Sequence, residues 1–175
     1  LMFFGLSFFD SINHSLTTTS TGGFSTKQES IAAFQNPFVE AVIVIFMFLA
    51  GTNFTMIYFG LKMKFRKIVN NDEFKWYLSA LLILILILSF YRAHTSSSDF
   101  IHSFREISFQ VVSIITTTGY ATADYTLWGS FLTFIFFLFL FSGASAGSTS
   151  GGIKIVRIIL LIENGLLECK RRLHR

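Results

Sequence analysis

The sequence has few charged residues for its length, and this shortage argues against a soluble domain. Asp, Glu, Lys and Arg make up 14% of the 175 residues, whereas a soluble domain is typically about a quarter charged. Apolar residues make up 52%, and the mean hydropathy is +0.60. The single cysteine, Cys169, excludes an intrachain disulfide and a cysteine metal site. It lies in a basic segment and is interpreted as an unpaired thiol.

Charge is absent altogether from three stretches that are rich in Leu, Ile and Phe. No Asp, Glu, Lys or Arg occurs in residues 41–61, 76–91 or 126–153. Because about 20 predominantly apolar residues cross a bilayer as an α-helix, the first and last stretches are long enough to span it, and 76–91 is borderline. The composition therefore predicts an all-α integral membrane protein in contact with the lipid bilayer.

The basic residues are concentrated in two segments, 62–75 and 154–175. By the positive-inside rule, both segments are expected on the cytoplasmic side of a cell membrane. Nucleic-acid binding is a weak alternative, because these residues flank predicted spans and no recognition module accompanies them. No signal peptide precedes the first apolar residues, and the chain begins inside an apolar pattern, so we expect a fragment of a longer protein.

A pattern of residues occurs twice along the chain. The motifs LTTTSTGGF and VSIITTTGY align when Gly23 is placed over Gly119, and Gly51 then aligns with Gly143 after a four-residue shortening. Each copy consists of a partly polar segment, a Thr/Gly turn, a polar stretch and a long apolar segment. Internal duplication of this kind is typical of transporter and channel folds.

The segments before the two turns, 3–19 and 99–115, are too polar to face lipid along their length. A partly polar helix that leads into a Thr/Gly turn fits a re-entrant pore helix, since non-helical backbone at membrane depth must be buried in protein or line water. The alternative is an amphipathic helix on the membrane surface followed by an external turn. The duplication of the pattern favours the pore helix.

The two turns, TGGF and TTGY, have the chemistry of a cation-selectivity filter. A filter needs successive carbonyl oxygens that replace the hydration shell of the ion, and glycine permits the backbone angles that this requires. Neutral oxygens suit a weakly hydrated monovalent ion, whereas Mg²⁺ or Ca²⁺ would favour carboxylates, which neither turn contains. Asp124 is expected to attract cations at the mouth. Two turns cannot enclose a pore, so a ring of four is expected, with two turns contributed from outside this chain.

The run SGASAGSTSGG, residues 142–152, contains only small residues inside the last apolar stretch. The spacing of Gly143, Gly147 and Gly151 allows a close helix-packing face. A phosphate-binding loop is rejected because Lys154 is displaced by one position and no Ser or Thr follows it. The favoured interpretation is an unwound segment in the middle of the membrane that acts as a gate. Lys154 either extends to the membrane surface or contacts this segment.

Two other classes of protein compete with a transporter. A non-conducting membrane scaffold would have no need of two glycine turns. An intramembrane enzyme is disfavoured because the spans lack a Ser–His pair or paired aspartates, and Glu40 is expected at the membrane interface. The protein is therefore predicted not to be an enzyme.

Three stretches of this sequence resemble the TrkH/TrkG and KtrB family of potassium-uptake proteins, within the Trk/Ktr/HKT superfamily. They are TSTGGFSTKQESIAAFQNP (19–37), FQVVSIITTTGYATADYTLW (109–128) and SAGSTSGGIKIVRI (145–158), and they follow the family's order and spacing. The resemblance implies repeated helix–pore-helix–filter-loop–helix units, four to a full chain, around a potassium pathway. This chain would hold most of the second repeat and all of the third.

The resemblance also implies the residues that act. The potassium filter would consist of Thr21, Gly22, Gly23, Thr117, Thr118 and Gly119, supported by Phe24 and Tyr120. The gating loop would include Gly143, Gly147, Ser148, Thr149, Ser150, Gly151, Gly152 and Lys154. Ser150 departs from the family, which often has glycine there.

The implied function is potassium uptake across a bacterial inner membrane, with a sodium-permeable relative as the alternative. Potassium is the transported ion, and no other cofactor is implied. The implied partners are the two remaining repeats, a second copy in a homodimer, and a cytosolic nucleotide-binding regulatory subunit of the TrkA/KtrA kind.

The expected organisation divides the chain into two repeats and two basic segments. The second repeat covers 1–63, with a pore helix at about 5–19, a filter at 20–26 and a membrane helix at about 38–62. A cytoplasmic linker follows at 64–75. The third repeat covers 76–162, with a membrane helix at about 76–92, a pore helix at about 99–115, a filter at 116–122 and a broken membrane helix at about 127–162. The basic tail is 163–175.

Overall fold

A computed structural model gives the fold of residues 1–96 and 99–173, and the regular structure in these ranges is helical. No strand occurs in the described ranges, where an isolated β-bridge joins Ser142 to Ile153. The all-α class predicted from the composition is confirmed.

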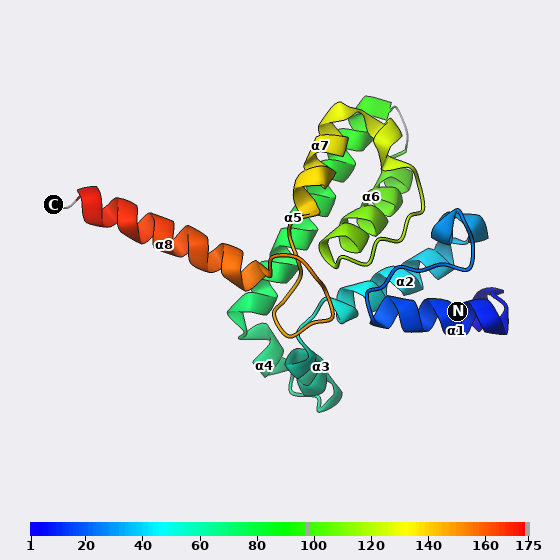
Figure 1. The fold of residues 1–175 in the computed structure, drawn as a ribbon, viewed down its shortest axis with the longest axis horizontal. Helices are drawn as coiled ribbons and strands as arrows, with labels where there is room; N and C mark the ends of the chain where they lie inside the picture. Colours follow the sequence, from blue (N-terminus) through cyan, green and yellow to red (C-terminus); the bar gives the residue numbers. More distant parts are fainter. Residues whose placement is uncertain (97–98, 174–175) are drawn as a thin grey trace.

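The first half of the fold contains two main helices that pack side by side (Figure 1). In order, its elements are η1 (Met2–Phe4), α1 (Phe8–Thr19), η2 (Ser30–Phe34) and α2 (Pro37–Ala50). The Ser7 side chain accepts a hydrogen bond from the Asp10 N–H, and the Asn36 side chain accepts one from the Phe38 N–H. These side chains cap the free donors at the starts of α1 and α2 and so fix where both helices begin.

The second half is built around a long helix, α5, which packs along α6 (Figure 1). In order, its elements are α5 (Asp72–Ser96), α6 (Phe100–Ile115), η3 (Tyr125–Trp128), α7 (Ser130–Phe139) and α8 (Ile155–Leu173). Two short helices, α3 (Phe54–Leu61) and α4 (Phe65–Val69), connect the halves. The halves also meet where α2 packs on α6.

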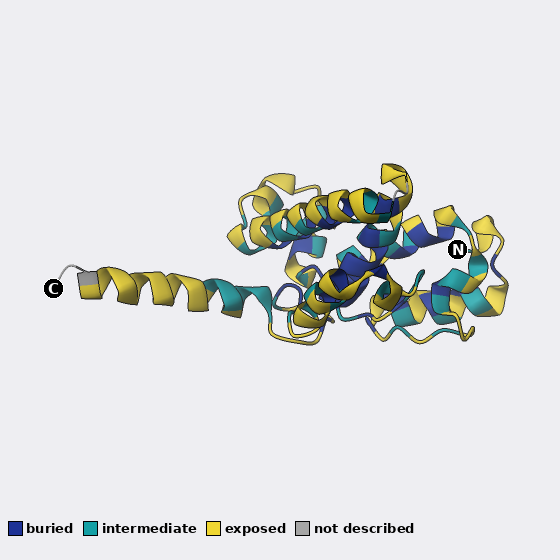
Figure 2. Ribbon diagram, turned by 90° about the horizontal axis from the view of Figure 1, so that it is seen from above, coloured by how far each residue is buried: buried dark blue, intermediate teal, exposed yellow. Residues whose placement is uncertain are grey.

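The shared core lies between α2, α5 and α6. Its buried apolar side chains include Ile43, Met47, Tyr77, Leu81, Ile107, Phe109 and Val111. Large apolar side chains are also exposed on the outward faces, and α8 projects away from the other helices with most of its surface open (Figure 2). Soluble proteins rarely expose apolar surface on this scale, so these faces suit lipid or further membrane helices.

By length and composition, α5 is the described helix that could cross a membrane by itself. The pair α2 and α3 passes the same test when taken together, but the two helices are bent by 110° at the break between them. The apolar helix α7 has 10 residues, which is about half of the length needed to span a bilayer.

The single membrane helix expected at 38–62 is wrong, because the chain bends sharply after Ala50. Gly51 leaves no room for a side chain: a Cβ there would lie 2.6 Å from the Tyr77 hydroxyl oxygen and 2.7 Å from Thr116 Cγ2. Asn53 then starts α3 by accepting a hydrogen bond from the Thr55 N–H. The bend therefore follows from close packing at a glycine and from a new helix cap directly after it.

The other expected boundaries shift for local reasons. The helix expected at 76–92 begins earlier, at Asp72, because the Asn71 side chain caps the Phe74 N–H. The helix expected at 127–162 is interrupted by 140–154, which contains no helix. The basic tail expected at 163–175 continues α8 as far as Leu173, and residues 174–175 lie outside the described ranges.

Candidate functional site

The two Thr/Gly turns share one backbone conformation. Thr21 and Thr117, at equivalent positions, have φ angles of 53° and 55°. Gly23 and Gly119, two residues later, have φ angles of 66° and 84°. Positive φ is uncommon for a β-branched residue such as threonine, and here it occurs at the same point in both turns. The duplication expected from the sequence is thus present in the backbone.

Both turns are also closed by equivalent hydrogen bonds. The Gly22 N–H donates to the Thr17 carbonyl over 2.8 Å, and the Thr118 N–H donates to the Ser113 carbonyl over 2.9 Å. These bonds reach back five residues to the last turn of α1 or α6, in the manner of a Schellman cap, with the preceding threonine left-handed. The C-terminal ends of α1 and α6 are therefore built alike.

A hydroxyl in the last helical turn fixes the far end of each Thr/Gly turn. Thr17 Oγ1 donates to the Phe24 carbonyl over 3.0 Å, and Ser113 Oγ donates to the Tyr120 carbonyl over 2.7 Å. Each turn is therefore tied to its own helix both at the middle and at the residue after the glycine.

The carbonyl oxygens between these ties are left without donors. In residues 1–96 and 99–173, no hydrogen bond reaches the carbonyl oxygens of Thr21, Gly22, Gly23, Thr117, Thr118 or Gly119. A buried or membrane-embedded carbonyl normally has a partner. These six oxygens are chemically free to coordinate a cation.

The two turns lie against each other. A Cβ added to Gly23 would overlap the Thr118 carbonyl oxygen. Tyr120 is 1% exposed, and its hydroxyl lies 2.5 Å from Thr17 Oγ1 of the other turn's helix. Tyr120 thus joins its own turn to helix α1. Its counterpart Phe24 is 76% exposed in the part of the chain that the structure describes.

We expect the Tyr120→Phe variant to loosen the junction between the turns. It removes the hydroxyl that bridges to Thr17 but keeps the buried ring, so the expected loss of stability is about 1 kcal/mol. Thermal unfolding of the full-length protein measures this loss. The matched control is Tyr125→Phe, since the Tyr125 hydroxyl has no hydrogen-bond partner among the described residues. An equal change in both variants would contradict a bridging role.

The small-residue segment 140–154 lies directly against both turns. Thr21 Oγ1 donates to the Thr149 carbonyl over 2.9 Å, and the Gly151 N–H donates to Thr117 Oγ1 over 2.6 Å. The two left-handed threonines therefore hold the same short stretch of this segment. We call residues 140–154 the small-residue loop.

The base of the small-residue loop is closed by backbone bonds. The Gly143 N–H donates to the Ile153 carbonyl over 2.8 Å, and the Ile153 N–H donates to the Phe141 carbonyl over 3.0 Å. A Cβ at Gly143 would overlap the Gly151 carbonyl oxygen, so glycine is required where the two ends of the loop pass close to each other. The helix-packing alternative does not apply, because this segment is not helical.

The loop also occupies the bend between α2 and α3. The Ser145 N–H donates to the Gly51 carbonyl over 3.1 Å, and the Thr149 N–H donates to the Ala50 carbonyl over 3.3 Å. Both carbonyls lie at the C-terminal end of α2, where no N–H of the same helix remains to bond to them. The bend and the loop thus satisfy each other's backbone groups, as non-helical backbone at membrane depth requires.

Comparison with known proteins shows the family to which this chain belongs. A family model described as "TrkH: Cation transport protein" matches residues 5–175. The chain belongs to the TrkH family. It is 35% identical to the Trk system potassium uptake protein TrkH of Escherichia coli K12, over 99% of this chain and 36% of that protein. It is 36% identical to TrkG of the same strain, over 97% of this chain and 35% of that protein.

A solved structure of the family has the same fold. The crystal structure of the potassium transporter TrkH from Vibrio parahaemolyticus matches with a TM-score of 0.91 and 32% identity, over 97% of this chain and 37% of that one. This chain therefore spans little more than a third of the length of the TrkH-family relatives it matches. Those relatives are transport proteins rather than enzymes.

In this TrkH-family chain, Lys154 contacts the small-residue loop. Its Nζ donates to the Ser150 carbonyl and, over 3.0 Å, to Ser150 Oγ. Ser150 Oγ in turn accepts a hydrogen bond from the Ala144 N–H over 3.2 Å. Of the two alternatives for Lys154, the structure has the contact with the loop. The Ser150 hydroxyl, absent from a glycine, is what links Lys154 to the first half of the loop.

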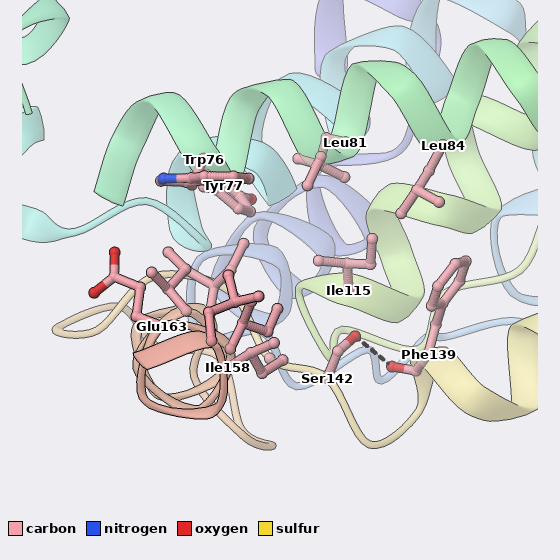
Figure 3. Close-up of a pocket in the computed structure, with 15 residues that line it drawn as sticks. Trp76, Tyr77, Leu81, Leu84, Ile115, Phe139, Ser142, Ile158 and Glu163 are labelled. Carbon is pink, nitrogen blue, oxygen red and sulfur yellow. Dashed lines mark hydrogen bonds between the residues drawn. The ribbon is translucent and has the colours of Figure 1, made fainter. Parts of the chain in front are cut away.

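An apolar cavity of about 370 Å³ lies at the foot of the loop, between α5 and α8 (Figure 3). Trp76, Tyr77 and Leu81 of α5 lie across it from Ile158 of α8, and Leu84 lies on the side of Phe139 (Figure 3). Ser142 and Gly143, at the start of the loop, also line the cavity. The loop is therefore not tightly packed on this side.

Three structural features of the site were not predicted from the sequence. Gly51 marks a bend, and its alignment with Gly143 was the signal that could have revealed it. Glu40, expected at the membrane interface, is buried and lies 3.2 Å from Arg105 Nε of α6. Glu73 of α5 contacts the loop, and no pattern in the sequence indicates this contact. Asp124 is exposed, and hydrogen bonds from Thr126 hold the pKa of its carboxyl below the usual range.

Proposed function

We propose that the full-length protein takes up potassium across a bacterial inner membrane, and that this chain supplies two of the four parts of its selectivity filter. One observation carries the proposal: two turns with the same backbone lie side by side and leave six carbonyl oxygens without donors. Rows of neutral carbonyl oxygens replace the hydration shell of a monovalent cation. The filter residues would be Thr21, Gly22, Gly23, Thr117, Thr118 and Gly119.

Potassium is the proposed ion because the relatives are described as potassium uptake proteins. The chemistry of the turns agrees with this choice. Neither turn contains a carboxylate, which a site for Mg²⁺ or Ca²⁺ would favour. The negative ends of the α1 and α6 dipoles point towards the two turns and would favour a cation there.

The small-residue loop is the proposed gate. It is hydrogen-bonded to both turns through Thr21 and Thr117, so it lies where an ion leaving the filter would pass. The cavity at its foot offers space for movement on the side of α8. Lys154 and Ser150 would hold the loop in the observed position.

The remaining elements of the proposal concern the whole assembly. Two further repeats would complete the ring, and the exposed ring of Phe24 would pack on one of them as Tyr120 packs on α1. A homodimer and a cytosolic nucleotide-binding subunit of the TrkA/KtrA kind are the proposed partners. The basic segments 62–75 and 154–175 would face the cytoplasm.

Uptake of rubidium or potassium by the full-length protein tests the proposal. We expect saturable uptake, and growth on low potassium, in a host that lacks its own uptake systems, with sodium a poor competitor. An empty vector is the control, and the amount of protein in the membrane is measured in parallel. Equal uptake of sodium would replace this proposal with a sodium-permeable relative. If the correctly inserted protein takes up neither ion, the alternative of a non-conducting membrane scaffold would be favoured.

A further inference from the structure

Glu73 holds the first half of the small-residue loop through its carboxylate. Glu73 Oε1 accepts a hydrogen bond from the Ala146 N–H over 2.5 Å, across 73 positions of sequence. In residues 1–96 and 99–173, no other Asp or Glu side chain makes a hydrogen bond to residues 140–154. This contact is therefore a specific tie between α5 and the loop.

The carboxylate is not held elsewhere. Among the described residues, no Lys, Arg or His lies within ion-pair distance of Glu73. Lys154, at the other end of the loop, attracts it electrostatically over a longer range. A hydrogen bond to a charged acceptor is roughly twice as strong as one between neutral groups. The Ala146 N–H has no other acceptor among the described residues, so loss of Glu73 would leave it unpaired.

The position of Glu73 differs from that of the other groups that hold the loop. The turns hold the loop through Thr21 and Thr117, and the bend holds it through Gly51. Glu73 lies in the first turn of α5, within the basic segment 62–75 that also contains α4, and α4 packs against α5. A movement of the segment 62–71 would therefore move the acceptor of the Ala146 N–H.

We propose that Glu73 is a positioning residue that keeps the small-residue loop across the ion path, and that displacement of α4 or the start of α5 releases it. This inference rests on the proposed gating role of the loop. In a two-state view, the hydrogen bond favours the closed loop, and its loss shifts the balance towards the open one. Glu73 touches neither the filter turns nor an ion, so the filter itself is expected to stay unchanged.

The test compares Glu73→Ala with Glu73→Gln and with Asp72→Ala in the full-length protein. Removing a hydrogen bond to a charged group shifts a two-state balance by about tenfold, so Glu73→Ala is expected to raise the maximal rate of rubidium uptake by at least about threefold. The concentration for half-maximal uptake should not change. Glu73→Gln keeps an acceptor oxygen and should stay within about twofold of the wild type. Asp72 is the matched control, because its side chain is 86% exposed and pairs only with Lys75 among the described residues.

A deletion of residues 148–151 separates this inference from the gate itself. If the deletion raises the rate but Glu73→Ala does not, the proposed role of Glu73 is wrong and the gating role of the loop is supported. If the deletion has no effect on the rate, the gating role of the loop is wrong. In the deleted background, Glu73→Ala should add nothing, and an additive increase would overturn the inference. A third outcome would also overturn the inference: uptake by Glu73→Ala falls only in proportion to the amount of folded protein, and Glu73→Gln does not restore uptake.

Discussion

We expect the Gly23→Ala variant to lose selective potassium uptake. Its φ of 66° costs an L-residue about 1–2 kcal/mol. A Cβ would also overlap the Thr118 carbonyl oxygen, which belongs to the neighbouring turn and is one of the six without donors. Strain and overlap together cost about 3 kcal/mol. This cost lowers the population of the native turn geometry by roughly 100-fold. Rubidium uptake with and without competing sodium measures the loss.

The control is Gly129→Ala, since Gly129 has a φ of 99° and no described atom within 4 Å of an added Cβ. It tests backbone strain without overlap, outside the turns, and with ψ at 154° that strain is at least as large as at Gly23. Wild-type selectivity in Gly23→Ala would show that the two turns do not form a filter.

Gly119→Ala then tests the ring. No described atom lies within 4 Å of a Cβ at Gly119, so this chain alone predicts only the cost of a φ of 84°. If a ring of four turns is correct, the equivalent carbonyl of a neighbouring turn would lie there in the full-length protein. A loss as severe as that in Gly23→Ala would support the ring, and an effect no larger than that in Gly129→Ala would count against it.

Deletion of residues 148–151 is expected to raise the maximal rate of uptake. The deletion removes the groups that bond to both turns, namely the Thr149 carbonyl and the Gly151 N–H. It also removes Ser150, the partner of Lys154. If the closed loop dominates at rest, opening the path should increase the rate by about fivefold or more. Initial rates of rubidium uptake at saturating concentration measure this change.

Selectivity should change less than the rate in the deletion, because the carbonyls of the turns remain. Gly165→Ala is the control for a change outside the loop, since Gly165 lies in α8 with open space around it. An unchanged rate in the deletion would indicate that the loop packs the fold together without obstructing ions.

The two equivalent Thr/Gly turns could be predicted from the sequence because their geometry is local. The Schellman bonds join residues only five positions apart, and the left-handed threonine and glycine follow from the same short motif in both copies. Duplication then made the prediction stronger than either motif alone. The small-residue run predicted a break for a similar reason: glycine-rich backbone has little tendency to stay helical.

The bend after Ala50 and the tie to Glu73 could not be predicted in this way. Gly51 stands in an apolar stretch that is long enough for one span, and helix propensity permits a single glycine. What breaks the helix is the Tyr77 hydroxyl and Thr116 packed against Gly51, together with the loop that bonds to the freed carbonyls. These contacts join residues from three distant parts of the chain.

The sequence by itself determined the helical membrane class, the two equivalent turns and the interrupted last helix. These features depend on composition and on neighbours along the chain, which a sequence displays directly. The tertiary structure alone decided that the loop lies against both turns, that it bonds to the carbonyls at the bend after α2, and that Glu73 and Lys154 form hydrogen bonds with it. Such contacts depend on where helices cross in space, and no local pattern of residues encodes that crossing.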